Sequence, residues 1–455
     1  MAIRYTIKGG VSVPRTFSTA TRTARVLHDV QRVHVPLYAF GQVECLPQIG
    51  EGNRVLRGQC IGAPTADGGL LRFSPVSGTV ESVGDRLCAD GTHVPLVTVL
   101  NDGQETGVPP HHFAGKLKDA EPSALIGYIR DMGLVSRGEP LYVRLERVDA
   151  QCKQLVVNCA ESQPDRALMR YLCENAADQI VNGAKILQKT LGISQAVIVI
   201  NGEYREAVDA LLDAIGESRL LRVAQVGSHH PQEDDISVLS AVGGVTVGRA
   251  RREYNTVQFV IGGDECAAVF RTFVTGMPDT ERTVAVSGDI VRESGYVRCP
   301  LGTPFSDLFR ACGGLTQTAQ TVVSGGLLSG RRVSADDFVE EDTVSLAALG
   351  ADQKKRDPLS AFFAKLTGAA AEDEEKRQCC IRCGACARVC PDDLLPHLML
   401  RAAQTGKYKP IDDLSLSRCR LCGACSYVCP SHIPLSRIFA AEKSKGGAES
   451  REESK

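Results

Sequence analysis

The spacing of apolar residues changes along the chain. Residues 33 to about 100 hold short apolar stretches broken by glycine and proline, as in Phe73-Ser74-Pro75-Val76-Ser77-Gly78. Closely spaced strands with this punctuation predict a compact β unit of barrel-sandwich type. No lysine stands at a hairpin tip where a swinging-arm carrier would need one, so this unit is expected to be structural or to serve in docking.

From about 120 to 275 the pattern predicts alternating strands and helices. Buried strands are expected at 155–157, 196–200 and 220–226. Between them, apolar residues recur at helical spacing from 168 to 191, and a further helix is expected over 203–215. Strands that alternate with helices predict an α/β sheet with crossover connections.

Residues 284 to 330 return to short segments separated by turns, which predicts a small β-grasp-like unit. The chain is therefore expected to be a multidomain α+β and α/β protein. The predicted divisions are an amino-terminal segment with the barrel-sandwich unit (1–115), the α/β domain (116–280), the β-grasp unit (281–333), a linker (334–378), a helical cysteine-rich domain (379–440) and a disordered tail (441–455).

Composition excludes several classes of protein. The formal net charge of the 455 residues is -2, so no global field favours nucleic acid as a partner. With no Trp and 5% aromatic residues, base-stacking platforms are not expected. The apolar runs are too short to cross a bilayer, which takes about 20 residues as a helix. The start of the sequence does not resemble a secretory leader, and we predict a cytoplasmic protein.

Cysteine is the unusual residue of the composition, with 18 copies. In a reducing compartment, clustered cysteines are typical of metal or redox sites rather than disulfides. Ten are scattered and are expected to be ordinary core or surface thiols: Cys45, Cys60, Cys88, Cys152, Cys159, Cys173, Cys266, Cys299, Cys312 and Cys379.

The other eight cysteines form two identical frames. Frame I (Cys380–Pro391) and frame II (Cys419–Pro430) both have the pattern C-x2-C-x2-C-x3-C-P. In this pattern three close thiolates hold three irons of a [4Fe–4S] cube, and the fourth ligand comes from the other frame. The predicted ligand sets are Cys380, Cys383, Cys386 and Cys429 for one cluster, and Cys419, Cys422, Cys425 and Cys390 for the other.

Zinc is the alternative metal. Zinc ribbons, however, use two separate C-x2-C knuckles rather than four cysteines in one tight run followed by proline, so the pattern favours iron–sulfur clusters. Cross-ligation places the two cubes close together, and neither lacks a ligand. We therefore expect transport of single electrons and no catalytic residue at the clusters.

The order of modules resembles the RnfC family, which includes the iron–sulfur subunit of Rnf ferredoxin:NAD oxidoreductases and related cobalamin reductases. Several stretches carry the resemblance besides the two frames: 8–14, 52–59, 74–78, 157–164, 287–290, 300–305 and 312–314. The resemblance implies a barrel-sandwich domain, a flavin domain like that of the complex I flavin subunit, a soluble-ligand-binding β-grasp (SLBB) domain and a dicluster ferredoxin domain.

One stretch departs from the family. Members that use FMN and NADH carry a Gly-rich loop that lets the backbone approach the flavin, and only Gly133, Gly138 and Pro140 echo that loop here. Of the acidic stretch that follows, Asn158 and Glu161 remain. Gly133, Gly138, Asn158 and Glu161 are therefore the candidate FMN residues. Two interpretations stay open: FMN binds through a remodelled loop, or the domain has lost flavin, NADH or both.

Three hypotheses of function follow. The first is an electron-transfer protein that passes single electrons through two [4Fe–4S] clusters between redox partners such as ferredoxin, a flavoprotein or membrane Rnf-type subunits. The second is an FMN-dependent NADH oxidoreductase of Rnf or cobalamin-reductase type; a docking scaffold with a vestigial flavin domain is a third. Location at the cytoplasmic membrane face or in a microcompartment is compatible with each. His229-His230 is expected in a surface loop, and Cys379 is expected to be a bystander.

Overall fold

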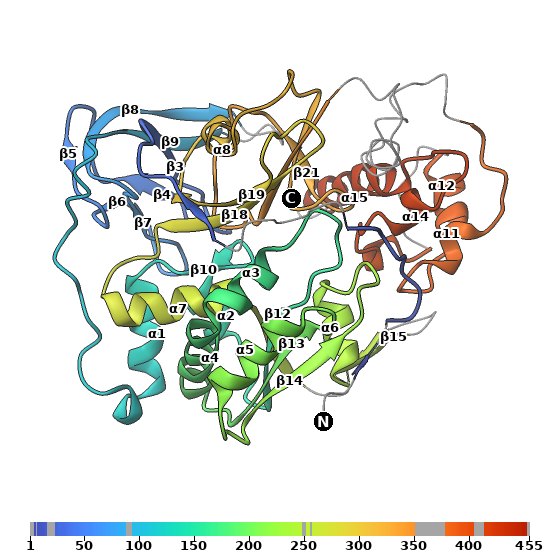
Figure 1. The fold of residues 1–455 in the computed structure, drawn as a ribbon, viewed down its shortest axis with the longest axis horizontal. Coiled ribbons are helices and arrows are strands. Elements are labelled where there is room, and N and C mark those ends of the chain that lie inside the picture. Colours follow the sequence, from blue (N-terminus) through green and yellow to red (C-terminus); the bar gives the residue numbers. More distant parts are fainter. Residues whose placement is uncertain are drawn as a thin grey trace.

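The computed structural model describes four modules (Figure 1). It covers the chain except residues 1–3, 6, 16–22, 88–92, 248–251, 255–256, 351–377, 405–413 and 453–455. Cys88 and most of the predicted linker lie outside the described residues. None of the helices in the described part is both long enough and apolar enough to cross a membrane.

Two antiparallel sheets form the barrel-sandwich domain. One has the order β3-β9-β8-β5 and the other β4-β6-β7. Their inward valines and leucines share one core with the β-grasp domain. The strands are β3 (Arg32–Pro36), β4 (Cys45–Pro47), β5 (Arg54–Val55), β6 (Cys60–Pro64), β7 (Arg72–Phe73), β8 (Gly78–Leu87) and β9 (His93–Asn101).

A five-stranded parallel sheet of order β1-β14-β13-β12-β17 forms the α/β domain. Its central strand β12 (Gln154–Cys159) is a nearly continuous apolar run because both faces of a parallel sheet are covered. Leu155 and Val157 face one core, and Val156 faces the other. The other strands are β1 (Arg4–Tyr5), β13 (Gln195–Asn201), β14 (Leu221–Val226) and β17 (Gln258–Gly262).

Helices cover both faces of this sheet. The longest, α4 (Ala177–Leu191), ends at Gly192, whose left-handed backbone (φ 66°) closes the helix. The expected helices and strands of this region are present; strand β17 and helices α1, α2, α6 and α7 were not predicted. The remaining helices are α1 (Pro122–Asp131), α2 (Leu141–Glu146), α3 (Leu168–Asn175), α5 (Arg205–Ile215), α6 (Asp235–Ala241) and α7 (Gly263–Thr275).

The β-grasp domain extends beyond its predicted end. Its sheet has the order β2-β19-β18-β22-β20-β21, and α8 (Phe305–Ala311) packs on it. Strand β22 (Ser345–Leu349) lies in the range predicted as linker, yet it is fully buried between β18 and β20. The other strands are β2 (Arg25–Val26), β18 (Glu281–Ser287), β19 (Gly295–Pro300), β20 (Thr321–Ser324) and β21 (Arg331–Val333).

The carboxyl-terminal lobe, red in Figure 1, contains both cysteine frames in a small helical domain. Its core holds apolar residues from between and after the frames, including Met399, Leu416 and Phe439. The last helix runs into the range predicted to be a disordered tail. The helices are α11 (Ala385–Arg388), α12 (Pro396–Ala403), α14 (Ala424–Tyr427) and α15 (Leu435–Glu452).

Candidate electron-transfer centres and the neighbouring cleft

The two cysteine frames share one backbone geometry. Positive φ angles occur at equivalent positions: Arg382 (55°) and Leu421 (56°), Gly384 (71°) and Gly423 (81°), and Asp393 (54°) and His432 (53°). After each glycine comes a single helical turn, α11 or α14, and after each proline comes a longer helix, α12 or α15. The lobe is thus a duplicated unit, as the repeated pattern of cysteines predicts.

Four of the predicted ligands line one cavity of the lobe. They are Cys390, Cys419, Cys422 and Cys425, the set that cross-ligation assigns to one [4Fe–4S] cluster. In the described part of the chain no three His, Cys, Asp or Glu side chains converge as ligands of one metal ion do. The donor chemistry of the four thiols suits the cluster.

Neighbouring thiols of the lobe raise one another's pKa. Burial raises the pKa of the Cys425 thiol, and Cys422, Cys419, Cys390 and Cys386 raise it further. Burial also raises the pKa of Cys386, to which Cys429 and Cys380 add. Because Cys386 of the other set also acts on Cys425, these contributions show that the thiols are close together, and the division into two ligand sets stays a prediction.

Frame II lies against the rest of the molecule. The buried Arg420 side chain donates to Asp234 Oδ1 (2.8 Å) and Ser237 Oγ (2.7 Å) of the α/β domain. It also donates to Asp392 Oδ2 (2.6 Å) within the lobe. Gly423 lies so close to the β-grasp domain that an added Cβ would be 2.2 Å from Leu328 O. Frame II is therefore fixed by both neighbouring domains.

His230 makes a second link between the α/β domain and frame II. Its Nε2 is 2.6 Å from the Cys422 carbonyl oxygen, and its Nδ1 is 3.1 Å from Glu233 Oε1. Burial lowers the pKa of His230, but Glu233 and the Cys422 side chain outweigh burial and raise it to about 10. The expectation of a surface loop is wrong for His230, which is 1% exposed. The loop folds inward because the lobe covers it.

The amino-terminal segment passes between the α/β domain and the lobe (Figure 1). Gly10 N donates to Val389 O (2.8 Å), and Lys8 pairs with Asp393 (2.6 Å). A Cβ on Gly9 would stand 2.9 Å from Cys390 O. Gly9 is therefore required by a close approach to the backbone of a predicted cluster ligand, and Gly10 by a close approach to His230 O, which would be 2.7 Å from an added Cβ.

A large cleft opens beside the parallel sheet. It has a volume of about 1420 Å³ and is lined by residues of the barrel-sandwich, α/β and β-grasp domains. Of the four candidate FMN residues, Gly138 and Asn158 line it, whereas Gly133 and Glu161 do not. A Cβ on Gly133 would meet Leu71 O at 2.7 Å, so this glycine serves packing against the barrel-sandwich domain.

The remaining candidates are held by protein groups. Asn158 Nδ2 donates to Glu233 O (2.9 Å) and Asp235 Oδ1 (3.0 Å). The Glu161 carboxylate accepts from the first amides of α3, Met169 N (3.0 Å) and Arg170 N (3.2 Å). Glu161 therefore caps a helix from a buried position, and burial raises its pKa.

The altered Gly-rich stretch is a two-residue hairpin. Strands β10 (Val135–Ser136) and β11 (Glu139–Pro140) flank a turn in which Arg137 (φ 54°) and Gly138 (φ 76°) both have positive φ. Two positive φ angles characterise a type I′ turn, which matches the twist of paired strands. The substitutions thus replace an open loop by a closed turn.

The backbone N–H donors nearest this turn are already bound to a carboxylate. Glu265 accepts from Arg137 N (2.9 Å) and from Gly262 N (2.6 Å) at the start of α7. Backbone amides at a helix start are where a phosphate group would bind. A flavin phosphate therefore does not fit there while Glu265 remains in place, and we derive no step through FMN.

Sequence reasoning missed Arg420, His230, Glu265 and Asp392. The sequence could have indicated one of them. Arg420 stands where frame I has Ile381, and such a difference within an otherwise repeated pattern indicates a residue with a role other than binding the cluster. The altered residues of the acidic stretch also serve docking, since Gln163 Oε1 accepts from Leu328 N (2.9 Å) of the β-grasp domain.

Four family models match successive parts of the chain. They are the RnfC barrel sandwich hybrid domain (residues 5–104), the Nuo51 FMN-binding domain (129–269), the SLBB domain (283–330) and the 4Fe-4S dicluster domain (379–433). The predicted fold class is confirmed. The chain thus carries a two-cluster [4Fe–4S] domain and a domain of the FMN-binding type, which together support electron transfer.

Curated relatives match over most of the chain. The RnfC-type subunit of the Na(+)-translocating ferredoxin:NAD(+) oxidoreductase complex of Acetobacterium woodii is 27% identical, covering 86% of this chain and 86% of the relative. Its counterpart in the proton-translocating complex of Clostridium ljungdahlii is 24% identical (86% and 82%). The equivalent subunit of the ion-translocating oxidoreductase complex of Rhodobacter capsulatus is 26% identical (97% and 83%). The resemblance inferred from the motifs is confirmed.

Proposed function

From the premise that this chain is a homologue of the RnfC subunit of Rnf complexes, we propose that it conducts single electrons through two [4Fe–4S] clusters. The observation that carries the proposal is the duplicated lobe, in which eight thiols with cluster spacing stand in two equivalent frames. Each cluster supplies one-electron chemistry when bound. The ligands we propose are Cys380, Cys383, Cys386 and Cys429 for the outer cluster, and Cys390, Cys419, Cys422 and Cys425 for the inner cluster.

The names inner and outer follow from the packing of the frames. Frame II supplies three ligands of the inner cluster and contacts the α/β domain through Arg420 and His230. Frame I supplies three ligands of the outer cluster, and Cys380 and Cys383 are exposed. Electrons would therefore pass between the α/β domain and solvent in the order inner cluster, outer cluster, or in reverse.

The chain's own residues give this route its rigidity. Arg420 joins two carboxylates from two domains, the buried Asp392 and the partly exposed Asp234, and its own side chain is 5% exposed. A buried arginine with this fixed fork of donors holds the two domains in one register. A constant spacing between a domain and a cluster is what an electron relay needs.

An FMN-dependent NADH oxidoreductase is the second candidate function. The match to an FMN-binding domain and the large cleft favour it. Glu265 stands against it, because its carboxylate takes the amides of Arg137 and Gly262. For this second function we retain Gly138 and Asn158 as the candidate FMN residues that line the cleft. Gly133 and Glu161, the other two candidates, do not line it.

We further propose that the physiological partners are redox proteins. The relatives are named as subunits of ion-translocating complexes, which supports a place beside a membrane partner. A location in a microcompartment has no such support.

Anaerobic purification with iron, sulfide and flavin analysis tests the proposal. We expect about eight irons per chain and two interacting S = 1/2 signals after reduction. An NADH-dependent dye-reduction assay then separates the two functions: a chain with full iron, no flavin and no NADH reaction is a relay only. Zinc in place of iron would refute both.

A further inference from the structure

Each position on the outer face of frame I has an equivalent position in frame II. In frame II, that equivalent face is covered by other domains of the protein. Ile381 occupies the position of Arg420, but Ile381 is 65% exposed whereas the Arg420 side chain is 5% exposed. Gly384 occupies the position of Gly423, and an added Cβ would come no closer than 3.7 Å to Arg388 Nη1. The exposed start of frame I thus repeats a docking surface, whereas its end at Val389 and Cys390 contacts the amino-terminal segment.

The described residues of this face include no unengaged negative side chain. Within the described ranges 378–391 and 414–441 there is no Asp or Glu. The two neighbouring acids are already engaged, Asp392 by Arg420 and Asp393 by Lys8. The protein part of this surface is therefore positive, through Arg382 and Arg388.

The two arginines have different surroundings. The cube and its four thiolates carry negative charge, and Arg388 Nη1 donates to Cys383 O (3.1 Å) close to that charge. Arg382 makes no ion pair with any residue that the structure describes, and its positive φ (55°) belongs to a sharp turn of the exposed loop. Arg388 accordingly offsets part of the negative charge of the cluster. Arg382 is available for an ion pair with a partner protein.

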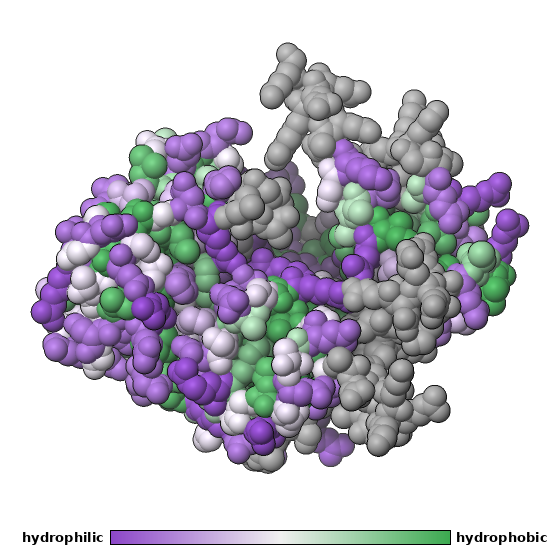
Figure 2. Space-filling view, turned by 90° about the horizontal axis from the view of Figure 1, so that it is seen from above, coloured by the Kyte–Doolittle hydropathy of each residue, from purple (hydrophilic) through white to green (hydrophobic). Residues whose placement is uncertain are grey.

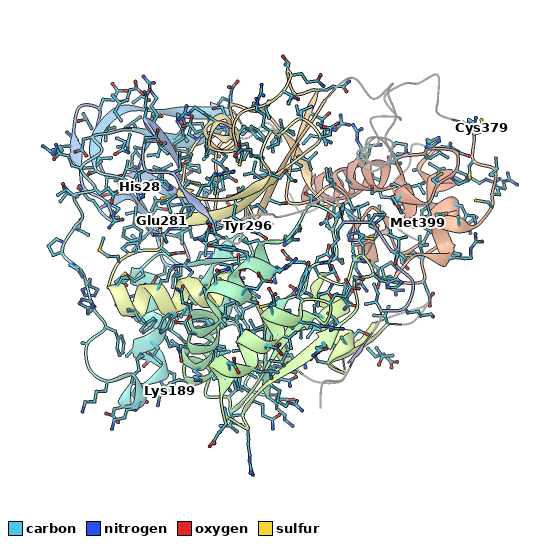
Figure 3. All side chains as sticks on the ribbon, in the orientation of Figure 1. His28, Lys189, Glu281, Tyr296, Cys379 and Met399 are labelled. Atoms are coloured by element: carbon cyan, nitrogen blue, oxygen red, sulfur yellow. The ribbon has the colours of Figure 1, made fainter. Side chains whose placement is uncertain are left out.

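Location agrees with an external partner. The lobe forms one end of the molecule, with Cys379 near its outer edge (Figure 3). Apolar side chains reach the surface of this lobe among hydrophilic ones (Figure 2). An exposed apolar side chain beside a cation is typical of the small interfaces of transient redox complexes, which stay below about 1,200 Å².

We infer that this face is the docking surface of an acidic one-electron carrier protein, with Ile381 as the apolar anchor and Arg382 as the cationic contact. The inference rests on the proposed function. In the transfer step the reduced outer cluster loses one electron and the oxidised carrier gains it, or the reverse; no bond forms or breaks. Charge complementarity selects an acidic protein, because the described residues of this surface offer cations and no unengaged carboxylate.

Stopped-flow electron transfer tests the inference with the full, cluster-loaded chain. The reduced chain is mixed with an acidic flavodoxin and, separately, with basic cytochrome c as a charge-reversed probe. For Arg382→Glu we expect the flavodoxin rate to fall about tenfold at low ionic strength and the cytochrome rate to rise. The difference should shrink at high salt, since mobile ions screen exposed charges. Ile381→Ser should lower the flavodoxin rate severalfold without changing its salt dependence.

Lys189→Glu is the matched control, since it changes the net charge equally and lies far from Cys379 (Figure 3). Equal effects of Lys189→Glu and Arg382→Glu would overturn the inference, as would a chain dimer that Ile381→Ser dissolves while the flavodoxin rate stays constant. Iron content and the reduced spectrum of each variant are measured first. A wild-type chain without clusters contradicts the proposed function, whereas loaded variants with unaltered flavodoxin rates contradict only the docking surface.

Discussion

Frame I and frame II have the same spacing of ligands and the same positive-φ positions, yet residues 380–383 of frame I are exposed, whereas the equivalent part of frame II packs against two domains. The difference arises at positions between the cysteines. Frame II has the buried Arg420 where frame I has the exposed Ile381. Gly423 touches the β-grasp domain, whereas an added Cβ at Gly384 would make only an ordinary contact, 3.7 Å from Arg388 Nη1.

The contrast between the frames separates residues that bind a cluster from residues that contact the surroundings. The cysteines and the positive-φ positions are repeated because both clusters need the same ligands and the same backbone path. The residues between them differ because one frame packs against two domains and the other is exposed. A duplicated lobe can in this way have one cluster beside the α/β domain and one cluster beside solvent. Electrons that pass through both clusters then travel between the domain and the outer surface.

Loss of equivalent ligands should have the largest effects. Cys383→Ser and Cys422→Ser are each expected to remove one cluster, so that iron falls from about eight to about four per chain. Because frame II also docks the lobe, Cys422→Ser should in addition expose the domain junction to protease. Iron analysis and limited proteolysis measure both. Full iron in either variant would refute the ligand assignment.

Arg420→Gln tests the buried side of the comparison. It leaves Asp392 and Asp234 without their shared cation, and breaking a buried ion pair costs about 3–5 kcal/mol. Denaturant unfolding followed by cluster absorbance should show this loss. Ile381→Gln introduces the same side chain at the equivalent exposed position and should change stability by less than about 0.5 kcal/mol. Similar costs for the two variants would contradict the assignment of inner and outer frames.

Gly423→Ala and Gly384→Ala compare a close approach with an ordinary contact. Both positions have positive φ, which costs alanine about 1–2 kcal/mol. Only at Gly423 would the new methyl group also collide with Leu328 O, and such overpacking adds about 1–3 kcal/mol. We therefore expect the unfolding free energy to fall more for Gly423→Ala. If both variants lose equal stability, the β-grasp domain does not pack closely against Gly423 of frame II.

The sequence predicted the duplicated frames well because thiolate spacing is a local requirement. It also predicted the buried strands, such as 196–200, from their apolar runs. The long-range contacts could not be predicted: His230 is buried only because a lobe about 190 residues later covers it. Glu265 was missed because its two amide partners, at Arg137 and Gly262, come from separate segments. Strand β22 fell within the predicted linker because its pairing partners are separate segments of the chain, which a local pattern does not reveal.

The smallest expected effect is on the potential of one cluster. Both ring nitrogens of His230 face acceptors, the Cys422 carbonyl and the Glu233 carboxylate, so both carry hydrogen and the ring is cationic. A hydrogen bond from a cation beside a ligand stabilises the more negative, reduced cluster. His230→Gln keeps one donor but removes the charge, and a loss of about 1 kcal/mol corresponds to roughly 40 mV for one electron. A redox titration followed by EPR should show one cluster moved to lower potential and the other unmoved. His432→Gln, in the exposed loop after frame II, is the control and should move neither cluster. Equal shifts of both clusters would mean that His230 acts through the whole lobe rather than through the inner cluster.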